Sequence, residues 1–388
     1  MIAVVERPSL WLRLKPVLTG FDGPLLAVVL ALAALGMVTM YSVGYDHGTR
    51  FVDHGRNMLL AAVLMFVVAQ VPPQRLMALA VPVYSLGVAL LVATALFGIT
   101  KKGATRWLNV GMVIQPSELL KLATPLMLAW WFQKCENRQV GQLRWTDFAV
   151  AGVLLLLPVA LVAKQPDLGT AILVLSGGLY VLFFAGLSWR LIVPVVLLGA
   201  VGLTAIVWYG DALCQDGIDW RVLREYQRQR VCTLLDPTRD PLGKGFHIIQ
   251  GMIAIGSGGL TGKGFMSGTQ THLEFIPERT TDFIFAAFSE EFGLGGVAAL
   301  VLGFSVLILR GLWIAASAPT VFSRLLAGAI SLGFFTYAFV NMGMVSGILP
   351  VVGVPLPFIS YGGTAMVTLG VALGMLMSIV RSRGLMQR

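Results

Sequence analysis

Apolar stretches of about 20 residues recur along this 388-residue chain and are separated by short polar segments. A helix rises about 1.5 Å per residue, so about 20 apolar residues span the hydrocarbon core of a bilayer. We therefore expect an all-α polytopic membrane protein, a single membrane domain over residues 1–388. The pattern predicts ten transmembrane helices, at residues 23–44, 54–71, 76–99, 116–133, 146–163, 168–187, 190–209, 281–309, 322–346 and 363–380.

The connections between these helices predict the orientation of the chain. Residues 1–22 form a short lead, and the first apolar run is long enough to span and lacks a small-residue cleavage site, so we expect no cleavable signal. An even number of helices places both termini on one side. That side carries more lysine and arginine in its short loops, which predicts cytoplasmic termini. Residues 210–280 then form a large exterior loop between the seventh and eighth helices.

Composition narrows the class of protein. The chain is 57% hydrophobic and 12% charged, with a mean hydropathy of +0.82, which excludes a soluble globular protein. A net charge of +9 fits the orientation signal and attraction to anionic headgroups, and without a basic soluble domain it argues against nucleic-acid binding. Cys135 lies on the cytoplasmic side. Cys214 and Cys232 share the exterior loop, where a disulfide is permitted but not required.

The exterior loop has a pattern that favours order. Residues 219–235 are typical of an amphipathic helix lying on the bilayer surface, and residues 236–241 end it. Residues 256–264 are glycine-rich but depart from a phosphate-binding loop, because Ser257 replaces a required glycine and Gly264 a required hydroxyl. Two interpretations remain: a tight turn, or a backbone nest that approaches a lipid pyrophosphate.

A polar motif over residues 106–121 leads into the fourth helix. Pro116 suits a helix start, and Glu118 and Lys121, three residues apart, share one helix face. They form either a structural ion pair or part of a substrate site. In the second interpretation, Lys121 and Arg106 offer cationic donors to a phosphate-bearing headgroup.

Two further connections are unusual. In residues 164–170, Asp167 is placed to cap the sixth helix. Residues 350–363 are rich in proline and glycine yet apolar. Non-helical backbone of this kind is tolerated at membrane depth only where protein or a cavity surrounds it. We expect a re-entrant or cavity-lining loop.

Residues 275–293 concentrate charge in an apolar chain, with Glu278, Arg279, Asp282, Glu290 and Glu291. Pro277 is expected to precede the eighth helix and Asp282 to lie on its first turn, where the helix dipole favours an anion. The other interpretation is a capping aspartate. Glu290 and Glu291 lie about 12 Å deeper, and since they cannot face one direction, at least one needs a partner or a water-filled cavity.

The chain resembles the SEDS family of bacterial membrane proteins (shape, elongation, division and sporulation), and its elongation members most of all. The resemblance rests on residues 106–121, 165–169, 256–264, 268–270, 273–279, 281–285, 290–291 and 341–363. It implies a ten-helix peptidoglycan glycosyltransferase of the bacterial inner membrane that polymerises lipid II. It also implies partnership with a class B penicillin-binding transpeptidase and other elongation-complex proteins.

The resemblance further implies that Asp282 is catalytic. An α-linked donor and a β-1,4 product mean inversion, with one general base for the attacking hydroxyl. Pyrophosphate leaves well when cations stabilise its charge, so a divalent cation such as Mg²⁺ is a candidate cofactor, although no metal-ligand constellation is evident. The candidate substrate-binding residues are Lys121, Glu118, Arg106, Arg279, Gln165 and Asp167.

Two other functions fit the same pattern. A lipid II flippase also needs many helices and an exterior polar cavity. A scaffold that only positions the transpeptidase needs no catalytic residue. Polymerisation that depends on Asp282 separates the glycosyltransferase from both.

Overall fold

The computed structural model describes residues 20–386 apart from 47, 102–103, 110, 112, 139–142, 216–224, 241–242 and 277. Its long helices are α2 (Gly23–Val43), α3 (Arg50–Ala69), α4 (Pro73–Phe97), α5 (Pro116–Arg138), α6 (Trp145–Lys164), α7 (Leu168–Phe184), α8 (Trp189–Trp208), α13 (Ile284–Ala316), α14 (Val321–Val345) and α15 (Gly363–Met386). Within the described residues, eight helices are long and apolar enough to cross a membrane. The protein is therefore a multi-pass membrane protein. The two long helices outside that set are α5, which carries charged residues, and α7, which has 17 residues.

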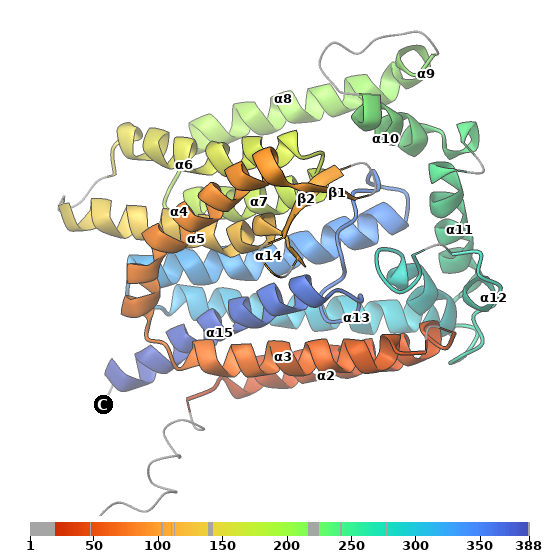
Figure 1. The fold of residues 1–388 in the computed structure, drawn as a ribbon, viewed down its shortest axis with the longest axis horizontal. Coiled ribbons are helices and arrows are strands. Elements are labelled where there is room, and N and C mark those ends of the chain that lie inside the picture. Colours follow the sequence, from red (N-terminus) through yellow and green to blue (C-terminus); the bar gives the residue numbers. More distant parts are fainter. Residues whose placement is uncertain are drawn as a thin grey trace, which may run out of the picture.

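The long helices lie side by side, and α2 begins at the same end of the bundle at which α15 finishes (Figure 1). Short helices gather at the opposite end: α9 (Gly210–Leu213), α10 (Glu225–Leu235), α11 (Lys244–Ser257) and α12 (Thr269–His272). A 3-10 turn at Pro237–Arg239 ends α10, close to the break expected there. Of the predicted surface helix, residues 219–224 lie outside the described part of the chain.

Burial within the bundle is uneven. In α14 and α15, nearly three quarters of the residues in the apolar stretch that could span a membrane are buried. In α8, no residue is buried. A helix that is apolar on all sides and contacts little protein suits a lipid environment. The packed centre therefore consists of α13, α14 and α15 with α5 and α7, and α8 lies at its edge (Figure 1).

The expectation of an all-α protein is wrong in one segment. Three short antiparallel strands, β1 (Ile99–Lys101), β2 (Ala104–Asn109) and β3 (Val113–Ile114), pair in the order β1-β2-β3 between α4 and α5. The segment is too polar to continue a spanning helix, and its Thr100, Thr105 and Trp107 favour extended backbone. The sheet places Arg106 on its central strand.

The predicted eighth helix also differs from the observed one. Helix α13 begins at Ile284, so Asp282 lies in the turn before the helix and not on its first turn. The reason is local: the carbonyls of Thr280 and Thr281 accept hydrogen bonds from Tyr361 N and Ser360 Oγ, at 2.8 and 2.7 Å, instead of from helical amides. Pro277 lies outside the described residues.

Candidate active site

Asp282 is held through its backbone. Asn341 of α14, which is buried, donates from Nδ2 to the carbonyls of Asp282 (3.0 Å) and Val354 (2.7 Å). Gly353 adopts a φ of +74°, and a Cβ placed there would lie 3.3 Å from Asp282 Oδ2. The turn that carries Asp282 is therefore fixed between α14 and the non-helical residues 350–362.

The side chain of Asp282 lines a cavity of about 160 Å³, large enough for several water molecules. Two helices of the exterior loop, α10 and α11, contribute to its walls together with the turn before α13. Its lining combines polar and apolar groups, namely Asp282, Glu278, Arg230, His247, Thr233, Ile248, Phe283 and Val351. Val351 belongs to residues 350–363, so the expectation of a cavity-lining loop is confirmed.

His247 and Arg230 differ in charge. Burial lowers the pKa of His247 below its ordinary value of 6.5, and the nearby carboxylate of Glu278 acts in the opposite direction. His247 is therefore largely neutral at neutral pH. Arg230 donates from Nη1 to the carbonyl of Val351 at 2.8 Å, which orients its guanidinium along the cavity wall.

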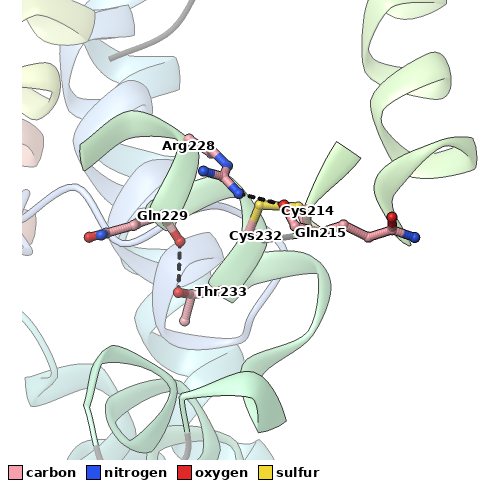
Figure 2. Close-up of a disulfide and its surroundings, with 6 residues drawn as sticks. All are labelled: Cys214, Gln215, Arg228, Gln229, Cys232 and Thr233. Atoms are coloured by element: carbon pink, nitrogen blue, oxygen red, sulfur yellow. Dashed lines mark hydrogen bonds between the residues drawn. A yellow bond between two sulfur atoms is a disulfide. The ribbon is translucent and has the colours of Figure 1, made fainter. Parts of the chain in front are cut away.

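Helix α10 is covalently tied to the residue that follows α9. Cys214 and Cys232 form a disulfide, which the sequence left open (Figure 2). Beside it, Arg228 donates to the carbonyl of Gln215 at 2.8 Å. The described part of the chain has one free cysteine, the buried Cys135. The tether holds the helix that carries Arg230.

Lys121 and Glu118 form the ion pair that their spacing predicts, with Nζ 2.6 Å from Oε1. Both are largely buried, Lys121 lies 5.3 Å from the ring centre of Tyr337, and Thr368 donates to Glu118 at 3.3 Å. Lys121 lines a second, mostly apolar cavity of about 40 Å³, separate from that of Asp282. The predicted ion pair is confirmed, and the substrate-binding role of Lys121 and Glu118 stays a prediction.

Arg106, Gln165 and Asp167 meet at the start of α7. Arg106 donates to the carbonyl of Pro166 at 2.6 Å and lies 3.8 Å from Asp167. Asp167 accepts from Thr170 N at 3.2 Å, so its capping role is confirmed. Gln165 donates weakly to the carbonyl of Leu91, at 3.4 Å. A role of these residues in substrate binding stays a prediction.

Arg279 is turned toward the α2–α3 connection. It pairs with Asp46, donates to the carbonyl of Val43 at 3.3 Å and lies 5.7 Å from the ring centre of Tyr45. None of the six predicted substrate-binding residues is among those lining the Asp282 cavity.

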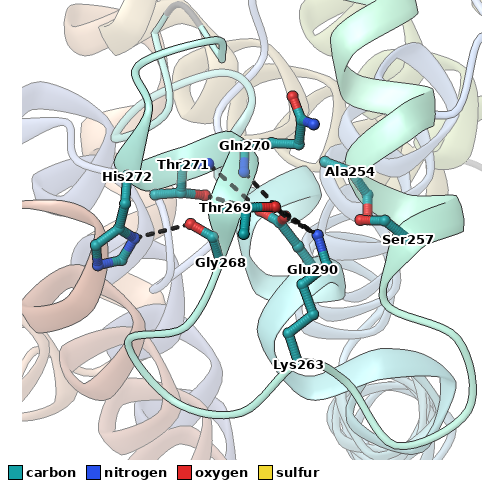
Figure 3. A network of polar contacts seen from close by, with 9 residues as sticks. All are labelled: Ala254, Ser257, Lys263, Gly268, Thr269, Gln270, Thr271, His272 and Glu290. Atoms are coloured by element: carbon teal, nitrogen blue, oxygen red, sulfur yellow. Dashed lines mark hydrogen bonds and ion pairs between the residues drawn. The ribbon is translucent and has the colours of Figure 1, made fainter.

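Glu290 is the centre of a polar network under the exterior loop (Figure 3). Its carboxylate is fully buried and accepts from Lys263 Nζ at 2.6 Å, Gln270 N at 3.0 Å and Thr271 N at 3.3 Å. Ser42 of α2 donates to the neighbouring Glu291. Both carboxylates therefore have protein partners, as their depth in the bundle requires.

The glycine-rich residues 256–264 form a tight turn. The amides of Lys263 and Gly264 donate to the carbonyls of Glu290 and Glu291, both at 3.0 Å. This pairing coincides with a break in α13, where Gly293 has a φ of +61° and a ψ of −165°. These two amides serve the kinked helix, so the tight-turn interpretation is confirmed at this end of the motif.

The sequence did not single out Arg230, Thr233 and His247 as site residues. Arg230 and Thr233 lie in a segment that reads as an amphipathic surface helix, and His247 lies beside an apolar run. The available signal was Cys232, close to Arg230 in sequence. Nothing in the local pattern places either helix against Asp282.

Comparison with known proteins finds one family along nearly the whole chain. A family model for cell cycle proteins, covering FtsW, RodA and SpoVE, matches residues 24–384. Peptidoglycan glycosyltransferase MrdB of Escherichia coli K12 is 48% identical over 370 residues, 95% of each chain. Peptidoglycan glycosyltransferase RodA of Treponema pallidum is 35% identical, over 92% of this chain and 97% of that one.

A solved structure agrees with this likeness. A chain from a structure described as structural coordination of polymerization and crosslinking by a peptidoglycan synthase complex matches with a TM-score of 0.76 and 33% identity, over 94% of this chain and 98% of its own. The crystal structure of rod shape determining protein RodA of Thermus thermophilus matches with a TM-score of 0.67 and 28% identity, over the same shares.

Proposed function

The chain belongs to the SEDS family, and from that premise we propose that it is a peptidoglycan glycosyltransferase that polymerises lipid II into β-1,4 glycan strands for cell elongation. The observation that carries the proposal for its active site is the position of Asp282, whose side chain lines a cavity while its backbone is fixed by Asn341. A carboxylate on a fixed backbone beside a water-sized space suits a general base.

With Asp282 as the general base, the proposed transfer takes place in one displacement. The 4-hydroxyl of the acceptor sugar gives its proton to the Asp282 carboxylate as its oxygen attacks the anomeric carbon of the donor. The bond from that carbon to the lipid pyrophosphate breaks, and the pyrophosphate leaves with the electron pair. Attack from the face opposite the leaving group converts an α-linked donor into a β-linked product. A second carboxyl acid is unnecessary, because pyrophosphate needs charge stabilisation rather than protonation.

A divalent cation such as Mg²⁺ remains a prediction. Among the described residues, no group of three or more histidine, cysteine, aspartate or glutamate side chains converges to hold a metal. A cation that assists the reaction would take its ligands mainly from the pyrophosphate oxygens, which bind Mg²⁺ readily.

We further propose that α5 and α7 cross the membrane with the eight longer apolar helices, which makes ten spans with both termini in the cytoplasm of a bacterial inner membrane. One observation supports this orientation, and another supports the number of spans. The Cys214–Cys232 disulfide requires an oxidising compartment on the side of the 210–280 loop. Helices α5 and α7 pack inside the bundle, where neighbouring helices shield the charges of α5 from lipid.

The proposed partner is a class B penicillin-binding transpeptidase. A neighbour in structure is a peptidoglycan synthase complex that coordinates polymerization with crosslinking. Glycan strands made at the Asp282 cavity would then meet the crosslinking enzyme on the same face of the membrane.

The test is polymerisation by purified protein given lipid II, Mg²⁺ and the transpeptidase partner. We expect glycan strands from the natural chain and a loss of at least about 100-fold in rate from Asp282→Ala, because a general base contributes about 10²–10⁴ in rate. Strands formed at the natural rate by Asp282→Ala would contradict the catalytic assignment. Movement of lipid II across vesicles without strand formation would favour a flippase.

A further inference from the structure

Arg230 stands out among the residues around Asp282. It lines the same cavity, and among the described residues of that lining it is the sole permanent cation, since the partly buried His247 favours its neutral form. The other charged members, Asp282 and Glu278, are carboxylates. A cavity that accepts a polyanion beside two carboxylates needs a cation that cannot be titrated away, and arginine keeps its charge at any physiological pH.

The geometry of α10 turns Arg230 toward the cavity. Thr233 also lines the cavity, and residues three apart share one face of a helix. Cys232 lies off that face and bonds to Cys214 beyond α8. The carbonyl of Val351 accepts from Nη1 of the guanidinium at 2.8 Å, which anchors one of its nitrogens at the cavity wall. An arginine held in this way offers several N–H donors in a rigid fork, which suits phosphate oxygens.

The reaction places a pyrophosphate near this residue. The proton acceptor, the anomeric carbon and the leaving group must lie within one reacting assembly. A leaving pyrophosphate therefore lies in or beside the cavity that Asp282 lines. The three cations that the sequence predicted for this task, Lys121, Arg106 and Arg279, are not among the residues that line it.

We propose that Arg230 binds the pyrophosphate of the lipid-linked donor, and that the Cys214–Cys232 disulfide holds α10 so that Arg230 keeps this position. The inference rests on the proposed function, whose substrate it locates. Arg230 is a substrate-binding residue, and the disulfide acts through it.

The experiment measures binding, so it does not depend on polymerisation. The full chain, carrying Asp282→Asn so that no turnover occurs, is placed in nanodiscs and titrated with undecaprenyl pyrophosphate. Arg230→Gln removes the charge but keeps a donor for Val351, and we expect it to weaken binding about tenfold, or about 1.4 kcal/mol. Arg228→Gln removes an equal charge from the same helix outside the cavity, and we expect no change.

Two further measurements test whether the lipid chain and the disulfide contribute to binding. Inorganic pyrophosphate in place of the lipid tests whether the lipid chain is needed for recognition. The double change Cys214→Ser with Cys232→Ser is expected to weaken binding about threefold when Arg230 is present. It should add nothing to Arg230→Gln, because changes that act through one group are not additive.

Unchanged binding by Arg230→Gln, in protein whose thermal unfolding is also unchanged, overturns the proposal. Equal weakening by Arg228→Gln overturns it as well, because bulk charge then explains the effect. If removal of the disulfide and Arg230→Gln weaken binding additively, the disulfide does not act through Arg230. Failure of the natural chain to polymerise lipid II would be a failure of the proposed function and is visible in a separate assay.

Discussion

Asp282 and Glu290 are carboxylates on the same stretch of chain, and the protein holds them by different groups. Asp282 is fixed through its backbone carbonyl, and its side chain lines a cavity. Glu290 is fixed through its side chain, whose oxygens accept from Lys263, Thr269 and the amides of Gln270 and Thr271. Asp282 therefore lies beside a space that can hold a substrate, whereas the carboxylate oxygens of Glu290 are taken up by donors of the protein itself.

The surroundings follow the same division. Around Asp282, three separate segments contribute charged or polar groups to a hollow space. Around Glu290, the donors come from one exterior segment, residues 263–271, and the carboxylate is fully buried. The first arrangement can admit a substrate, and the second ties the exterior loop to α13.

The largest change in stability is expected from Glu290→Gln. An amide in place of the carboxylate loses the ion pair with Lys263 and turns an N–H₂ group toward backbone donors. We expect a loss of about 3 kcal/mol in the free energy of unfolding, since breaking a buried pair costs about 3–5 kcal/mol. Thermal and denaturant unfolding in detergent measure it. Glu274→Gln, on an exposed carboxylate of the same loop, is the matched control, with an expected change within about 0.5 kcal/mol.

A smaller effect is expected from Gly353→Ala, which should mainly lower the rate of polymerisation. The left-handed backbone at Gly353 is strained for any side chain, and the added Cβ would press on Asp282 Oδ2. We expect a rate of polymerisation about tenfold lower, with a loss of stability of about 1–2 kcal/mol. Gly362→Ala, in the same loop with only an ordinary contact to Ala365, should leave the rate unchanged. Equal losses in both variants would mean that Asp282 is not the group affected.

The sequence predicted features that depend on neighbouring residues better than features that depend on distant segments of the chain. Hydrophobic spacing was enough to place the long helices, and i, i+3 spacing was enough to pair Glu118 with Lys121, because both depend on local periodicity. The start of α13 was missed because Ser360 and Tyr361, far along the chain, bond the carbonyls before it. Long-range contacts of this kind leave no mark on local pattern.

The composition of the Asp282 cavity was missed for a related reason. Arg230 and His247 approach Asp282 only through the path of α10 and α11, which the disulfide and the packing against α13 and α14 set. The sheet at residues 99–114 was missed because its strands are only two to six residues long. Alternation shows over about four to eight residues, so β1 and β3 are too short to reveal it, and the six residues of β2 do not alternate between apolar and polar.

The smallest effect concerns pH and tests whether the cavity accepts a charge on His247. Its pKa is lowered in the folded state, so the unfolded chain binds the proton more readily. The contribution of neutral His247 to the free energy of unfolding is therefore fully present above pH 6.5. It is lost as the pH falls from 6.5 through the pKa of His247 in the folded state. We expect the unfolding temperature of the natural chain to fall more steeply over this range than that of His247→Asn. If the unfolding temperatures of the natural chain and of His247→Asn change equally with pH, this prediction is wrong.

We propose that Asp282, and not Glu290, is the carboxylate that takes part in the reaction. The most direct measurement compares initial rates of lipid II polymerisation by Asp282→Asn and Glu290→Gln, each normalised to folded protein and assayed with the transpeptidase partner. We expect a rate at least about 100-fold below that of the natural chain for Asp282→Asn, and a rate within a few-fold of it for Glu290→Gln. A substantial rate from Asp282→Asn, or an equal loss from folded Glu290→Gln, would contradict it.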